Sequence, residues 1–361
     1  MINVFRNDDS DIDWLPELLQ GIDYQITTNL DTPKNLTVSF ITCLDLDNDS
    51  GTYSHSYKGT LPYIKFNEKI AEIEHYATKS RAVFIIETGI YPCVGRTVHA
   101  TAHLTNVFWL IPGRVKDAEQ TAYLGWHSEN TVKVYNYHAL SLDPYSVKPR
   151  YFDALLGTSK THRDFVYRHI NEIGAKDSVI MTYYGNNTGA ESLLGHTGFI
   201  WNPNGCVHPN EQEPTLSTEN VEYFGHNVRL SQIIVEEVYN TTAYSIITES
   251  YYFNDFSFVT EKTAKAILGC RLFVMFSGMG FLRDLRRLGF QTFDGIIDES
   301  YDLVEHDDTR FALAMQQVKR LLVAPQAPIL ELARPICEHN FALLTSGQIH
   351  NNMLDFVRSK M

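Results

Sequence analysis

The sequence has no run of about 18 apolar residues, so no transmembrane helix is expected. The N-terminal residues are acidic and include no apolar segment of the kind found in signal peptides. The five cysteines are far apart and form no CxxC pair. These absences predict reduced thiols in a cytoplasmic protein that makes no contact with a membrane.

Basic charge is also scarce, since the formal net charge is −13 and neither half of the chain is basic. This balance disfavours tight, non-specific binding to nucleic acid. A local basic cleft stays open as an alternative, because Arg150, Lys160, Arg163 and Arg168 cluster in the sequence.

Metal-binding patterns are incomplete. The acidic run Asp45–Asp49 places Ser50 where a calcium loop needs glycine and Ser56 where it needs a bidentate glutamate. His99 and His103 have helical spacing but lack the surrounding zinc-protease pattern. We therefore predict no bound metal, and we interpret the acidic run as a solvated turn.

The residues that are present predict an α/β protein with two domains. The chain has 361 residues, of which 44% are hydrophobic, and apolar strand-like runs alternate with amphipathic stretches. Residues 140–150 contain two prolines and no clear period, and the alternation restarts after them. We expect an N-terminal domain over residues 1–149 and a C-terminal domain over residues 150–361, each Rossmann-like and facing a central cleft.

Strands and helices are expected at specific places. The expected strands are 2–5, 24–27, 38–44, 83–87, 107–111, 151–156, 178–184, 244–247 and 271–276. The expected helices are 15–21, 64–78, 162–173, 228–239 and 261–268, followed by a helical tail over 309–360 that breaks near its prolines. Residues 185–225 are expected to form a long irregular insertion.

The most informative segment is Thr260-Glu261-Lys262, which follows an apolar strand and opens a helix. Thr260 is a good N-cap residue. A helix N-terminus at the carboxyl edge of a parallel sheet attracts phosphate, so Lys262 could neutralise a diphosphate and Glu261 could accept from ribose hydroxyls. An ordinary capped surface helix is the alternative.

Other candidate residues follow strands in the same way. Arg163 lies in the first turn of the helix after residues 151–156 and could clamp a diphosphate with two hydrogen bonds. Gly278 and Gly280 lack the full dinucleotide fingerprint and the P-loop lysine, so we expect them to allow close approach of the backbone to a ligand or a helix. Glu87 ends an apolar strand and is a candidate general base.

The C-terminal half contains an ordered set of motifs that resembles those of a known enzyme family. The set comprises Phe258–Thr263, Leu272–Phe276, Gly280–Leu285, Leu288–Phe293, Asp298–Asp302, Arg310, and Phe152–Gly157 followed by His162-Arg163. This set resembles bacteriophage-encoded GT-B-type glycosyltransferases, with a donor half similar to that of fucosyltransferases. The resemblance covers roughly residues 150–315, whereas residues 1–149 match only loosely.

The resemblance implies a transferase that moves a sugar from a nucleotide-sugar donor to a hydroxyl acceptor without a metal cofactor. Glu261 would hold the donor ribose, and Lys262 and Arg163 would hold the diphosphate, next to Thr260, Gly278 and Gly280. Glu87 or Asp45 would deprotonate the acceptor. There are two candidate acceptors. One is hydroxymethylated pyrimidine in phage DNA, which would be modified in the host cytoplasm, and the other is a cell-surface glycan. A non-catalytic relic that serves as a virion or host-binding protein is the alternative from another class.

Overall fold

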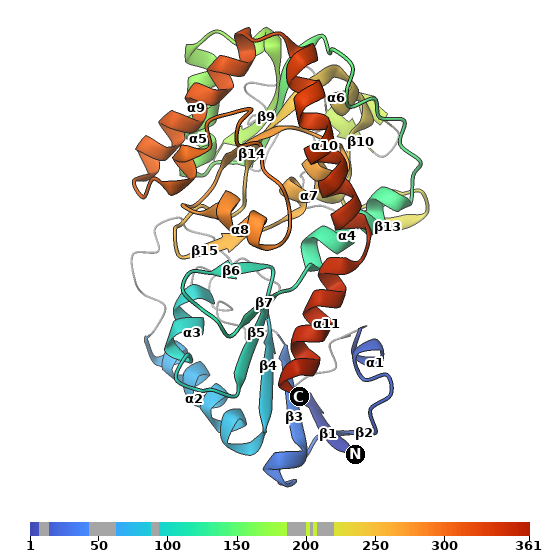
Figure 1. Ribbon diagram of the computed structural model, residues 1–361, viewed down its shortest axis with the longest axis vertical. Helices are drawn as coiled ribbons and strands as arrows, with labels where there is room; N and C mark the ends of the chain where they lie inside the picture. Colours follow the sequence, from blue (N-terminus) through green and yellow to red (C-terminus); the bar gives the residue numbers. More distant parts are fainter. Residues whose placement is uncertain (7–13, 43–62, 88–93, 186–199, 203–204, 208–219) are drawn as a thin grey trace. The chain divides into compact units, whose positions relative to one another are not determined.

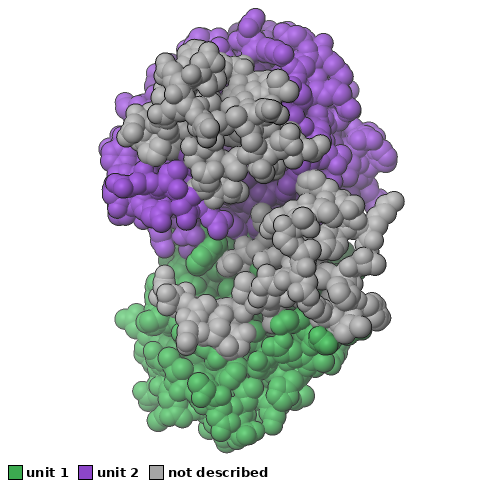
Figure 2. Space-filling view, turned by 180° about the vertical axis from the view of Figure 1, so that it is seen from behind, with its two compact units in different colours: residues 1–126, 347–361 green, residues 127–346 purple. Residues whose placement is uncertain are grey.

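The computed structural model describes residues 1–6, 14–42, 63–87, 94–185, 200–202, 205–207 and 220–361. The chain forms two compact units, which are coloured separately in Figure 2. The first consists of residues 1–126 together with 347–361, and the second of residues 127–346. Both contain a parallel sheet flanked by helices, so the protein is a mixed α/β structure of Rossmann-like character (Figure 1).

The first unit is built on a six-stranded parallel sheet in the order β2-β1-β3-β4-β5-β7. Its strands are β1 (Ile2–Arg6), β2 (Tyr24–Thr27), β3 (Thr37–Thr42), β4 (Ala82–Ile86), β5 (Val107–Ile111) and β7 (Thr121–Tyr123), with the short β6 (Gly113–Val115) between the last two in sequence. Its helices are α1 (Leu15–Leu18), α2 (Tyr63–Lys79), α3 (Val94–Ala100) and α11 (Gln348–Lys360).

Helix α11 belongs to the first unit although it comes from the far end of the chain. Its buried residues Met353, Leu354 and Val357 join the apolar cluster that contains Val4 and Phe84 of the sheet. Arg358 donates to the carbonyl oxygen of Leu18 at 3.3 Å. Figure 1 shows α11, in red, beside the blue strands of this unit.

The second unit is built on a four-stranded parallel sheet in the order β16-β14-β8-β9. These strands are β8 (Arg150–Thr158), β9 (Val179–Gly185), β14 (Thr242–Thr248) and β16 (Phe273–Phe276). The remaining strands are β10 (Ile200–Asn202), β11 (Gly205–Val207), β12 (Asn220–Tyr223), β13 (His226–Arg229) and β15 (Phe256–Phe258). The helices are α4 (Trp126–Asn136), α5 (Thr161–Glu172), α6 (Glu236–Thr241), α7 (Glu261–Leu268), α8 (Phe281–Arg287), α9 (Asp307–Val323) and α10 (Gln326–Thr345).

The strand order of the second sheet reverses between β8 and β14. From β8 the chain passes through α5 to β9 on one side, whereas β14 and then β16 are added on the other side. Loops at the carboxyl ends of β8 and β14 therefore diverge from a topological switch point. In open α/β sheets this is the place where ligands bind most often.

A buried ion pair ties the central strands of this sheet together. Arg271 donates to Asp153 at 3.1 Å, and both side chains are almost completely buried. Arg271 also donates to the carbonyl oxygens of Tyr239 and Tyr244, each at 2.9 Å, while Ser245 donates to Asp153 at 2.8 Å. The ion pair and these hydrogen bonds compensate the burial of both charges, since breaking a buried pair would leave an uncompensated charge and be strongly destabilising.

The unit boundary falls after Trp126, earlier than the domain boundary predicted at residues 149 and 150. Helix α4 lies in the second unit because Val134 packs with Tyr223, Val228 and Ile233. The assignment of acceptor and donor roles to two domains stays a prediction.

Two expectations for helices were wrong. The helix expected over 228–239 begins only at Glu236, because Val228 pairs with Val221 in a β-hairpin. The tail breaks at Pro325, between α9 and α10, as expected, but Pro328 and Pro335 lie within α10 and do not break it. Pro328 is in the first turn, where its missing N–H is not needed for helical bonding.

Candidate functional site

The carboxyl edge of the second sheet holds three cations, two of which meet at Ser250, the second residue after β14. Lys160, after β8, donates from its Nζ to the Ser250 carbonyl oxygen at 2.6 Å. Lys262, in the first turn of α7, donates from its Nζ to the Ser250 hydroxyl at 3.0 Å. Arg163 is 5% exposed, lies in the first turn of α5, and acts electrostatically on Lys160. The two predicted phosphate ligands therefore share one edge with a third cation, Lys160, at the switch point.

Burial strongly affects these cations. Burial, reinforced by the positive charges of Arg163 and Lys262, lowers the pKa of Lys160 to about 7. Burial also lowers the pKa of Arg163 to about 10, against the opposing pull of Glu261 and Glu249. Burial and mutual repulsion make the charged forms of neighbouring cations unfavourable when no anion is bound between them. Side chains with strongly shifted pKa values occur at functional sites more often than elsewhere.

Glu261 lies beside Lys262 and forms an ion pair with it. Burial opposes ionisation, but the charges of Lys262 and Lys265 prevail and lower the pKa of Glu261 to about 2. Glu261 is therefore ionised at neutral pH, and one of its oxygens already binds Lys262.

The N-terminus of α7 is capped as the sequence predicts, but it is not open to a phosphate. The Thr260 hydroxyl accepts from the Lys262 amide at 3.3 Å. The buried carboxylate of Glu249 accepts from the amides of Thr260 and Thr263 at 3.2 and 3.3 Å, and from both threonine hydroxyls at 2.6 Å. Because Glu249 occupies the helix terminus, the attraction for an anion comes from the side-chain cations.

Glu249 was missed at the sequence level. Its partners Thr260 and Thr263 lie 11 and 14 residues further along the chain. The available signal was an acidic residue two positions after the strand expected over 244–247, followed further along the chain by two threonines that flank a helix start.

Gly278 and Gly280 have structural reasons to be glycine. A Cβ atom at Gly278 would lie 2.1 Å from the carbonyl oxygen of Phe253, so the turn after β16 packs directly on the loop after β14. Gly280 has a φ of +85° and precedes α8, whose first amides are capped by Asp302. The close approach predicted for this turn is thus made to the protein's own backbone.

The candidate bases lie in the first unit or outside the described residues. Glu87 directly follows β4, at the carboxyl end of that strand, and its side chain is 1% exposed. Its role as a base stays a prediction. Asp45 falls outside the described residues. No group of three or more acidic, histidine or cysteine side chains that could hold a metal occurs within the part of the chain that the structure describes.

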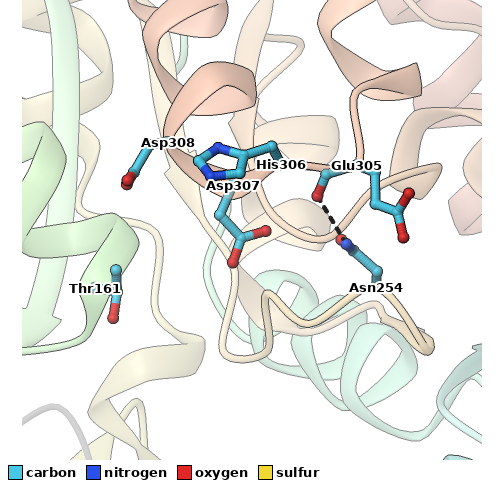
Figure 3. A pocket seen from close by; sticks show the side chains of 6 residues that line it. All are labelled: Thr161, Asn254, Glu305, His306, Asp307 and Asp308. Carbon is cyan, nitrogen blue, oxygen red and sulfur yellow. Dashed lines mark hydrogen bonds between the residues drawn. The ribbon is translucent and has the colours of Figure 1, made fainter.

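A shallow hollow of about 600 Å³ opens at the same carboxyl edge of the second sheet (Figure 3). Its lining is polar: Thr161, Asn254, Glu305, His306, Asp307 and Asp308. Asn254 donates to the Glu305 carbonyl oxygen at 2.9 Å and fixes one wall. Thr161, one of the lining residues, directly follows Lys160 in the chain.

His162 is completely buried behind this edge. Its Nε2 lies 2.7 Å from the carbonyl oxygen of Glu249, so Nε2 carries the hydrogen. Burial and the charge of Arg163 hold its pKa well below the usual range. His162 is therefore neutral and positions the backbone around Glu249.

Comparison with known proteins adds no assignment, because no family model and no curated protein matches this chain. None of the helices among the described residues combines the length and apolarity needed to cross a membrane.

Proposed function

We propose that this protein is a nucleotide-sugar-dependent glycosyltransferase of the GT-B type. One observation carries the proposal: Lys160, Arg163 and Lys262 converge where the order of the second sheet reverses. Two amines that meet at one serine, beside a buried guanidinium and at the switch point of a parallel sheet, suit an anionic ligand such as a diphosphate.

In this proposal the second unit holds the donor. Lys262 and Arg163 bind the diphosphate and stabilise the leaving nucleotide, so no metal ion is needed for that charge. Glu261 keeps Lys262 in place with one oxygen and accepts from a ribose hydroxyl with the other. The polar hollow beside Thr161 supplies carboxylate and amide groups, which are suited to sugar hydroxyls.

The first unit supplies the acceptor site and the base. Glu87 is the candidate base because it ends a fully buried strand, and Asp45 is the alternative. The acceptor is a hydroxyl group of hydroxymethylated DNA or of a cell-surface glycan. The net charge of −13 favours the glycan, while the resemblance of the C-terminal motifs to those of phage enzymes favours DNA.

Calorimetric titration with UDP, GDP and ADP tests the donor site. Lys262→Ala should weaken binding of the preferred nucleotide by roughly 30- to 1,000-fold, because a charged contact in a desolvated site is worth about 2–4 kcal/mol. Lys176→Ala is the matched control, since Lys176 is an exposed lysine of the same unit. Equal affinities of wild type and Lys262→Ala would contradict the donor site and favour a non-catalytic relic.

A further inference from the structure

Lys160 is the cation of this cluster that the sequence motifs do not identify. It is the N-cap residue of α5, and its backbone amide donates to Asp164 at 3.2 Å. Its side chain reaches across the switch point to the loop after β14, where Nζ donates to the Ser250 carbonyl oxygen at 2.6 Å. This contact holds the amine on the same residue that binds Lys262.

We infer that Lys160 is a third phosphate-binding group of this site and that its amine accepts a proton when a nucleoside diphosphate binds. The inference rests on the proposed function, because it takes the diphosphate as the ligand. The proton comes from the solvent. It converts the neutral amine into an ammonium group, whose additional N–H donor is available to a phosphate oxygen.

The charged groups around Lys160 explain why its amine holds a proton only weakly in the empty site. Arg163 on α5 and Lys262 on α7 oppose a third positive charge, and burial opposes it further. Glu249 and Glu261 favour the charge, but they do not prevail. Glu249 is surrounded by threonine hydroxyls and amides, and Glu261 is paired with Lys262. A bound diphosphate would add negative charge with no such partners, so it would shift the balance towards the ammonium form.

Because nucleotide binding is coupled to protonation of Lys160, the affinity for the nucleotide should depend on pH. With a pKa of about 7 in the empty protein, Lys160 is mostly neutral at pH 8, so binding should take up about 0.9 proton there. Above pH 7 the affinity should fall as pH rises, by about 50-fold between pH 7 and pH 9. The terminal phosphate of the nucleotide titrates near about pH 6 and does not interfere in this range.

The test is calorimetric titration with UDP, GDP and ADP at pH 8 in Tris and in HEPES buffer. The two buffers differ in ionisation enthalpy, so the difference in measured heat gives the number of protons taken up. Wild type and the control Lys176→Gln should take up about 0.9 proton per nucleotide bound. Lys160→Gln should bind about 10- to 100-fold more weakly at pH 7, with no uptake.

Lys160→Arg provides a second variant that keeps the positive charge. Because arginine stays protonated at these pH values, this variant should bind without proton uptake and with an affinity that is flat from pH 7 to pH 9. Binding by wild type without uptake, or uptake that persists in both variants, overturns the role of Lys160 and leaves the proposed function intact. Absence of binding by all three nucleotides overturns both.

Discussion

Glu249 is the residue that organises the carboxyl edge of the second sheet. Its two oxygens accept from three backbone amides and two hydroxyls, contributed by Ser250, Thr260 and Thr263. These bonds join the end of β14 to the start of α7. They also fix Ser250, on which Lys160 and Lys262 converge.

Glu249→Gln should therefore destabilise the protein, although it preserves shape. One carboxylate oxygen becomes an NH₂ group that faces N–H or O–H donors, and two or more hydrogen bonds are lost in a buried site. We expect a loss of about 2–4 kcal/mol in the free energy of unfolding, measured by urea denaturation. The exposed Glu172→Gln should change it by less than about 1 kcal/mol. An unchanged urea midpoint for Glu249→Gln would contradict this role.

Contacts between residues close in the sequence could be predicted at this site, and contacts between residues far apart in the sequence could not. Thr260 was predicted as an N-cap because capping depends only on residues two or three positions away, and the Thr260–Lys262 bond confirms it. Lys160 also lies at a helix start, but the contact that places it in the site is its hydrogen bond to Ser250, 90 residues later. Only the strand order reveals that these two residues are neighbours.

At the scale of elements, the helices at this edge follow a common rule. The first amides of α7 are bound by Glu249 and those of α8 by Asp302, while Asp164 accepts from the amide that precedes α5. Each helix terminus thus contains a carboxylate from the chain itself. Helix-terminus fields are neutralised internally, and the electrostatics of the edge is set by long cationic side chains.

The turn between β16 and α8 gives a prediction at this scale. In Gly278→Ala the new methyl group would overlap the Phe253 carbonyl oxygen, which is part of a backbone and cannot rotate away. We expect a loss of about 2–3 kcal/mol in unfolding free energy, together with weaker nucleotide binding as the 249–255 loop shifts. The measurements are urea denaturation and calorimetric titration.

Gly174→Ala is the control for Gly278→Ala, because it introduces backbone strain without a steric overlap. Gly174 has a φ of +68°, but a Cβ atom there would meet nothing within 4 Å. Its substitution should cost about 1 kcal/mol and leave nucleotide affinity unchanged. Equal effects of the two alanine variants would show that the contact with Phe253 is not restrictive.

The elements themselves were largely predictable, with informative exceptions. The buried strand β4 appears as a continuous apolar run, and β14 contains the apolar residues Ala243, Tyr244, Ile246 and Ile247, so the places of both were found. Residues 228–239 have an apolar content that suits either a strand or a helix, and pairing of Val228 with Val221 decides between them. The length of α10 was missed because Pro335 was taken as a break, whereas the helix continues through it.

At the scale of the whole molecule, α11 completes the first unit. Leu354 is 1% exposed and packs in the cluster of the first sheet. Leu354→Ala should cost about 2–5 kcal/mol, and the loss should be confined to that unit. Hydrogen exchange should quicken in β1, β3 and β4 and stay unchanged in β8 and β14. Leu332→Ala is the control, because Leu332 is 60% exposed. Faster exchange in both units would contradict separate cores.

The return of residues 347–361 to the first unit has a consequence for synthesis on the ribosome. The second unit is continuous in sequence, so it can fold as soon as its own residues emerge. The first unit must wait while residues 127–346, which number 220, are translated. At 5–20 residues per second this takes about 10–40 s. During that interval the apolar face later covered by α11 stays accessible to chaperones, so the earliest part of the chain is the last to reach its native packing.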